Sequence, residues 1–110
     1  MAHGDPAILM QADGARIRIL NGTSTARLDT RTGSYLSFQG IPVAEFGKTK
    51  ATSRTTIILY SPKLYALRYL LDLFGIKSST QILVKPDLSQ TVDIEIRLGT
   101  DWVKKLPAGY

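Results

Sequence analysis

TTIILYSPKLYALRYLLDLFG, residues 55–75, predicts a buried strand followed at once by a helix. The run Thr55–Tyr60 is rich in β-branched residues, which is typical of a central strand. Ser61 is the expected N-cap and Pro62 the first helical residue, where the missing N–H of proline costs no hydrogen bond. The helix carries an apolar stripe at helical spacing. Its members are Leu64, Leu67, Leu70, Leu71 and Phe74. Gly75 is the expected end of this helix.

The segment before this stretch predicts a first strand and a first helix. Residues Ala15–Leu20 alternate between apolar and basic side chains, which indicates a half-buried strand. A helix is expected over Thr25–Gln39, capped by Thr23 or Ser24 and followed by Gly40 as its C′ residue.

Three further strands complete the pattern. Ile41–Phe46 contains Pro42 near its start, which favours an edge position because proline cannot donate to a ladder. Gln81–Lys85 is a short strand, and Val92–Leu98 alternates without exception. The residues of that last strand expected to face the core are Val92, Ile94, Ile96 and Leu98. Either of these two strands could pair with the first.

The resulting order is β-α-β-β-α-β-β, which predicts an α+β fold. We expect a two-layer sandwich with a ferredoxin-like mixed sheet, two helices on one face and one added strand. The chain has 110 residues, of which 44% are hydrophobic and 21% charged, so one domain is expected. We place it at 15–102, with 1–14 as an N-terminal tail or a leftover of cloning. Trp102 is expected to close the core, and 103–110 to form a frayed C-terminal tail.

Several kinds of chemistry are excluded by residues that the chain lacks. There is no cysteine, and His3 is the single histidine, so thiolate metal sites and Ser-His-Asp triads are ruled out. Asp93 and Glu95 are interpreted as outward surface charges rather than a catalytic pair. We therefore expect no enzyme, no metal and no cofactor. No stretch approaches the roughly 20 apolar residues of a membrane span, and no signal-peptide pattern begins the chain.

Two groups of residues are candidates for binding a ligand. Asn21-Gly22-Thr23 lies where the first strand meets the first helix, so it could bind an anion or a sugar, or could simply form a turn with an N-cap. Arg16 and Arg18 share one strand face and could join a basic patch or an ordinary solvated face. The other basic residues that could complete the patch are Lys48, Lys50, Arg54 and Arg97.

The remaining surface signals are weaker. Fourteen Lys and Arg against nine Asp and Glu give a net charge of +5, which suits an anionic partner. No aromatic residues interleave with the strand arginines, which argues against nucleic acid. Tyr65 and Tyr69 lie four residues apart on the second helix, either as an exposed pair or as packing at the margin of the core.

The order of these motifs resembles the C-terminal domain of LytR–CpsA–Psr proteins. The residues that carry the resemblance are Leu20-Asn21-Gly22-Thr23, Tyr35-Leu36 with Gly40, Thr55–Ile58 with Tyr60, Tyr69-Leu70 with Gly75, and Val92–Ile94 running into Leu98–Trp102. It spans about 15–102. Residues 24–27 contain no glycine, unlike the glycine-rich helix entry that is typical of the family.

The resemblance implies a non-catalytic accessory domain of a bacterial cell-envelope protein, in an extracytoplasmic location. It implies that the domain engages peptidoglycan or an anionic glycopolymer, or contacts another domain of its parent protein. The ligand-binding candidates are then Asn21 and Thr23 as hydrogen-bonding residues, with Arg16 and Arg18 as the charged ones. The alternative is a protein-interaction or self-association module that acts through an exposed sheet edge.

Overall fold

The computed structural model describes residues 14–110 and confirms the β-α-β-β-α-β-β order. Its elements are β1 Ile17–Asn21, α2 Leu28–Phe38, β2 Glu45–Lys48, β3 Thr56–Leu59, α3 Leu64–Phe74, the 3₁₀ turn η2 Ser79–Gln81, β4 Ile82–Val84, β5 Ile94–Leu98 and α4 Thr100–Val103. The predicted N-terminal tail lies outside the described residues, apart from Gly14.

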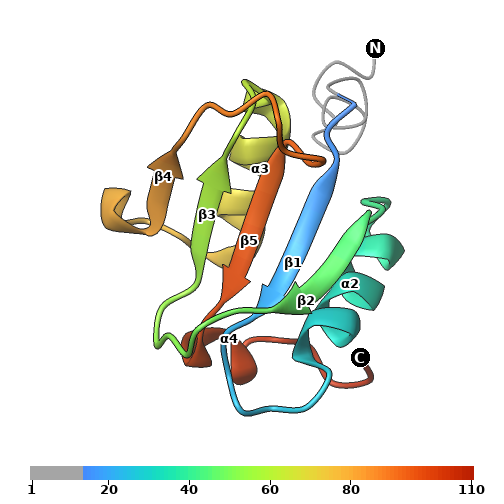
Figure 1. The fold of residues 1–110 in the computed structure, drawn as a ribbon. Helices are drawn as coiled ribbons and strands as arrows, with labels where there is room; N and C mark the ends of the chain where they lie inside the picture. Colours follow the sequence, from blue (N-terminus) through green and yellow to red (C-terminus); the bar gives the residue numbers. More distant parts are fainter. Residues whose placement is uncertain (1–13) are drawn as a thin grey trace.

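The strands form one mixed sheet in the order β2-β1-β5-β3-β4 (Figure 1), which confirms the α+β class. β1 pairs in parallel with β2 and with β5, and β3 pairs in parallel with β4. β5 and β3 are antiparallel. The last strand therefore pairs with the first, which settles the pairing that the sequence left open. It lies at the centre of the sheet, between the β1-α2-β2 unit and the β3-α3-β4 unit. Within each unit the two parallel strands are direct neighbours.

The main core lies between one face of this sheet and the helices, with α3 behind β3 and β5 in Figure 1. Its largest fully buried aliphatic side chains are Ile17, Ile19, Leu28, Leu36, Ile41, Ile57, Leu70, Ile94, Ile96 and Leu98. Each such side chain stabilises the fold by roughly 1.5–3 kcal/mol relative to exposure. Strands rich in isoleucine on one face are therefore what hold the two layers together.

Helix α3 starts later than the sequence predicts. Its N-cap is Lys63, with no side-chain cap, so the prediction of Ser61 as N-cap and Pro62 as first helical residue is wrong. The expected stripe is also shifted, because the small Ala66 occupies a buried position while Leu64 is 64% exposed. Gly75 ends the helix at φ 65°, as expected for a left-handed residue.

Helix α2 is shorter than the predicted Thr25–Gln39. Its N-cap is Arg27 at φ 58°, and no side chain caps it, so Thr23 and Ser24 do not have the predicted capping role. Gly40 at φ 87° follows the helix, which confirms the position of its end. The residues before Arg27 form a separate turn, because the Asn21 side chain forms hydrogen bonds to Thr23 and Thr25.

The segment after the last strand is packed rather than frayed. Trp102 is buried, as predicted, and its Nε1 donates to Thr32 Oγ1 at 2.9 Å. Leu106 is also buried in the core, and the Tyr110 ring meets the Tyr35 ring edge-on at 5.2 Å between centroids. Aromatic contacts therefore hold this segment against α2.

The sheet face opposite the helices has its own small apolar cluster, formed by Ile58, Tyr60 and Val92. Val92 was predicted to face the main core, and this is wrong. The strand begins at Ile94, so the alternation does not extend to Val92. We call this the open face.

Candidate functional site

Asn21, the first candidate residue, is buried at the end of β1, and both the nitrogen and the oxygen of its side-chain amide form hydrogen bonds within the protein. Its Nδ2 donates to the carbonyl of Thr25 at 2.8 Å. Its Oδ1 accepts from the Thr23 backbone N–H at 2.9 Å and from the Thr23 hydroxyl at 2.7 Å. Thr23 Oγ1 in turn accepts from the Thr25 N–H at 3.1 Å. Asn21 and Thr23 thus form an Asx-type turn that precedes α2.

Gly22 lies at the centre of this turn, where neighbouring atoms leave no room for a side chain. A Cβ there would lie 2.7 Å from the carbonyl oxygen of Leu98 and 2.8 Å from a methyl group of Thr52. The Gly22 N–H donates to that same Leu98 oxygen at 3.0 Å, and the Gly22 carbonyl accepts from the Thr52 N–H at 2.9 Å. The Asn21-Gly22-Thr23 turn is therefore tied to β5 and to the loop after β2.

Arg18 lies on the open face and is bound on both sides by carboxylates. Its Nε donates to Glu45 Oε1 at 3.1 Å and its Nη1 to Glu95 Oε1 at 2.8 Å. Gln90 Oε1 also accepts from the guanidinium, at 3.2 Å from Nη2. Burial works against the charge of Arg18, but the bonds to Glu45 and Glu95 outweigh it and raise the pKa of Arg18. The Arg18 guanidinium is therefore bound by three side chains of the protein, two of which are carboxylates that balance its charge.

Glu95 is 2% exposed, so the prediction that it is an outward surface charge is wrong. It sits between Arg18 on β1 and Ile58 on β3 in the sheet register. Its second oxygen accepts from Arg97 Nε at 2.6 Å. These neighbours cover Glu95, and two arginines compensate for its loss of water. Asp93 instead binds the backbone N–H of Arg16 at 2.9 Å.

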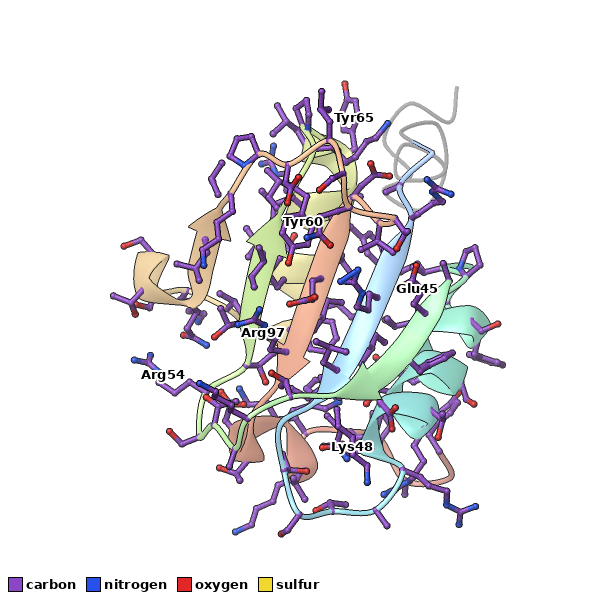
Figure 2. The ribbon with its side chains drawn as sticks, viewed as in Figure 1. Glu45, Lys48, Arg54, Tyr60, Tyr65 and Arg97 are labelled. Carbon is purple, nitrogen blue, oxygen red and sulfur yellow. The ribbon has the colours of Figure 1, made fainter. Side chains whose placement is uncertain are left out.

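The basic patch expected on the strand face is therefore charge-balanced. Arg16 is exposed, but Arg18 and Arg97 are paired with Glu45 and Glu95. Figure 2 looks onto this face, with Arg97 in its middle and Glu45 on its β2 side. Arg16 and Arg18 do not act together as a cationic pair.

Unpaired basic side chains gather instead at the carboxyl ends of β1 and β2. A hollow of about 590 Å³ opens there beside the start of α2. It is lined by Asn21, Thr23, Ser24, Thr25, Ala26, Arg27, Asp29, Thr30 and Lys48. Arg27 and Lys48 are exposed, and Lys48 marks this lower end of the molecule in Figure 2. The crevice beyond the carboxyl ends of parallel strands is the usual ligand position in α/β sheets.

A second hollow of about 390 Å³ adjoins the first, because both are lined by Arg27 and Thr30. Arg31, Ser34, Gly109 and Tyr110 complete its lining. We call the two hollows together the α2 groove. Its charged lining residues are three cations, Arg27, Arg31 and Lys48, and one acid, Asp29. The sequence signal that could have found it is the i, i+4 spacing of Arg27 and Arg31 at the start of a helix.

The other sequence candidates lie elsewhere. Lys50 is exposed in the loop after β2, and Arg54 Nη2 donates to Gln81 Oε1 at 3.1 Å. Tyr65 is 54% exposed and lies at the end of the molecule opposite Lys48 (Figure 2). Tyr69 instead packs against the core. The two tyrosines therefore do not form one exposed pair.

Within 14–110, no three acidic, histidine or cysteine side chains come together as a metal site would require. No helix in that range has the length and apolar character needed to cross a bilayer.

Comparison with known families gives one match. The family model LytR_C, described as LytR cell envelope-related transcriptional attenuator, matches residues 14–102. That range covers both β-α-β units and the Asn21-Gly22-Thr23 turn. No curated protein and no solved structure matches the chain.

Proposed function

Because the chain belongs to the LytR_C family of cell envelope-related domains, we propose that it is a non-catalytic, extracytoplasmic accessory domain that engages an anionic wall polymer. The α2 groove is the binding surface in this proposal. The polymer is a glycan that carries phosphate or carboxylate groups, presented on peptidoglycan.

The observation that carries the proposal is the charge and hydroxyl content of the α2 groove. Its cations Arg27 and Lys48 are exposed, and neither side chain is used in the ion pairs of the open face. The lining also brings hydroxyls from Ser24 and Thr30. Exposed cations attract a polyanion, and hydroxyls bond to sugars, so a charged glycan satisfies both.

This proposal gives the four sequence candidates different roles. Asn21 and Thr23 line the groove but act through the turn that they hold together. Arg18 acts through the sheet, and Arg16 remains an exposed cation outside the lining. In this proposal, Arg27 and Lys48 make the direct contacts to the anionic groups of the polymer.

The test is binding of the purified domain to insoluble peptidoglycan, with and without its attached anionic polymers, across a salt series. We expect binding that needs the polymers and weakens as salt screens exposed charges. The double variant Arg27→Gln, Lys48→Gln should lose it. The double variant Arg68→Gln, Lys85→Gln removes the same charge from exposed residues elsewhere and is the matched control. Equal loss in both doubles, or binding to neither wall preparation, would contradict the proposal.

A second candidate function, protein interaction, is favoured by an apolar area at the β4 edge. Val84 is 64% and Leu88 99% exposed. A hollow of about 220 Å³ nearby is lined by Leu59, Tyr60, Ser61, Pro62, Val84 and Pro86. An exposed short edge strand can accept a strand from a partner. Sedimentation over a concentration series separates this candidate, since a strict monomer argues against self-association.

A further inference from the structure

A third hollow lies between β2 and the outer side of α2, and it differs in chemistry from the α2 groove. It measures about 390 Å³ and is lined by Thr30, Gly33, Ser34, Ser37, Pro42, Val43 and Phe46. None of these side chains is charged. Thr30 is shared with both hollows of the α2 groove, and Ser34 with one of them. The uncharged hollow therefore continues the cationic groove along the helix.

The Phe46 ring forms one wall of this hollow and is seated directly on the helix backbone. A Cβ on Gly33 would lie 2.4 Å from Phe46 Cε1 and 2.6 Å from Cζ, so the ring occupies the space that any side chain at 33 would need. Glycine inside a helix costs roughly 0.5–1 kcal/mol relative to alanine. The glycine thus lowers the stability of the helix at this position but leaves room for the Phe46 ring.

Phe46 nevertheless remains 44% exposed. One side of the ring is held by Gly33, and the rest faces solvent at the wall of the hollow. Phe38, on the same helix as Gly33, is 77% exposed, and the centroid of its ring lies 6.2 Å from that of the Tyr110 ring. Of these two exposed phenylalanines, Phe46 is the one that lines the uncharged hollow.

The remaining lining is suited to a sugar ring. Pro42 and Val43 add apolar surface, while Thr30, Ser34 and Ser37 bring hydroxyls. The Ser34 hydroxyl donates to the Thr30 carbonyl at 3.2 Å, which leaves its oxygen lone pairs as acceptors. A sugar ring has C–H groups that pack on an aromatic face and hydroxyls at its rim. A largely apolar wall with a few polar groups is the common composition of ligand sites.

We propose that this hollow is a subsite for one uncharged sugar ring, which packs on Phe46, of the same glycan whose anionic groups lie in the α2 groove. The inference rests on the proposed function and adds its sugar specificity. Continuity through Thr30 and Ser34 lets neighbouring units of one chain occupy the two regions together.

The test uses peptidoglycan that carries its anionic polymers, at one fixed salt concentration of about 0.15 M, where exposed charges still contribute to binding. Phe46→Leu should weaken this binding by about three- to tenfold, the range expected for losing an aromatic contact. Phe46→Tyr keeps the ring and should retain binding. Phe38→Leu is the matched control and should leave binding unchanged. Thermal unfolding of each variant shows that the fold is intact.

A second measurement needs no variant. Soluble N-acetylglucosamine oligosaccharide added to the wild-type domain should shift the NMR signals of the Phe46 ring and of Ser34, but not those of Phe38. Unchanged Phe46 signals, or equal binding by Phe46→Leu and wild type, would overturn the subsite. If the Arg27, Lys48 double still loses polymer binding in that case, the proposed function stands. If wild type binds neither wall preparation, the proposed function itself fails.

Discussion

Arg18 bridges two carboxylates on neighbouring strands: its Nε lies 3.1 Å from Glu45 Oε1, and its Nη1 lies 2.8 Å from Glu95 Oε1. The three residues occupy one register row across β2, β1 and β5. This row uses charge to connect the three strands on the open face, while isoleucines line the core face of β1 and β5. The same row removes Arg18 from the ligand-binding candidates.

We expect Arg18→Met to lower the free energy of unfolding by about 3–5 kcal/mol, because it leaves the buried Glu95 with one arginine fewer. Urea unfolding measures the change. Arg16→Met, at an exposed position two residues earlier, should stay within about 0.5 kcal/mol of wild type. Similar midpoints for both variants would show that the bridge is not needed for stability.

The stability of the domain should fall in acid partly through Glu45. The hydroxyl of Thr91 and then Arg18 lower the pKa of Glu45 below its ordinary value of 4.5, against burial that raises it. The folded state therefore releases this proton more readily than the unfolded chain, so stability rises with pH in that window. The contribution is complete above the unfolded pKa and is lost as pH falls through the folded one.

Glu45→Gln tests this point, because an amide cannot titrate. Urea midpoints are measured from about pH 7 down to about pH 3, the range in which carboxylates titrate. As the pH is lowered, the midpoint should fall less steeply in the variant than in wild type. The pKa of Asp87 is also lowered, chiefly by the Ser89 hydroxyl, so some acid sensitivity should remain. Identical pH slopes in both proteins would remove Glu45 from the explanation.

Gly33→Ala should destabilise the domain, although Gly→Ala inside a helix normally stabilises it by up to about 1 kcal/mol. The added methyl would lie 2.4 Å from the Phe46 ring, so the ring must move, and overpacking of this kind costs about 1–3 kcal/mol. In a Phe46→Ala background the same change should become neutral or stabilising. Equal effects in the two backgrounds, measured by thermal unfolding, would show that the ring and the glycine are not coupled.

Asn21→Ala should lower the free energy of unfolding by about 1–3 kcal/mol, because it leaves the Thr25 carbonyl and the Thr23 N–H without their partners. Any loss of polymer binding should then follow from the altered turn. Thr23→Val removes only the hydroxyl bonds and should cost less. Weaker binding at unchanged stability would instead identify Asn21 as a direct contact residue.

Much of the fold could be predicted because its signals are local. The β-branched run of β3 and the glycines after α2 and α3 reflect backbone preferences of single residues. Helix starts were predicted less well. Ser61 and Thr23 are good N-caps by residue type, yet the N-cap of α3 is Lys63 and that of α2 is Arg27, because contacts made elsewhere in the chain set the local backbone.

By itself, the sequence determined the order of strands and helices, and that one apolar face joins them, because period and backbone preference act over a few residues. The tertiary structure alone decided what the polar side chains do. Arg18 and Glu95 are 77 positions apart, and only pairing of β1 with β5 brings them to 2.8 Å. That pairing places a carboxylate against the charge of Arg18. The packing of α2 beside β2 instead leaves Arg27, Lys48 and Phe46 exposed on one side of the molecule. A charged side chain or an aromatic ring can contact a ligand only if the residues packed around it leave it exposed and unpaired. Those residues come from distant segments of the chain.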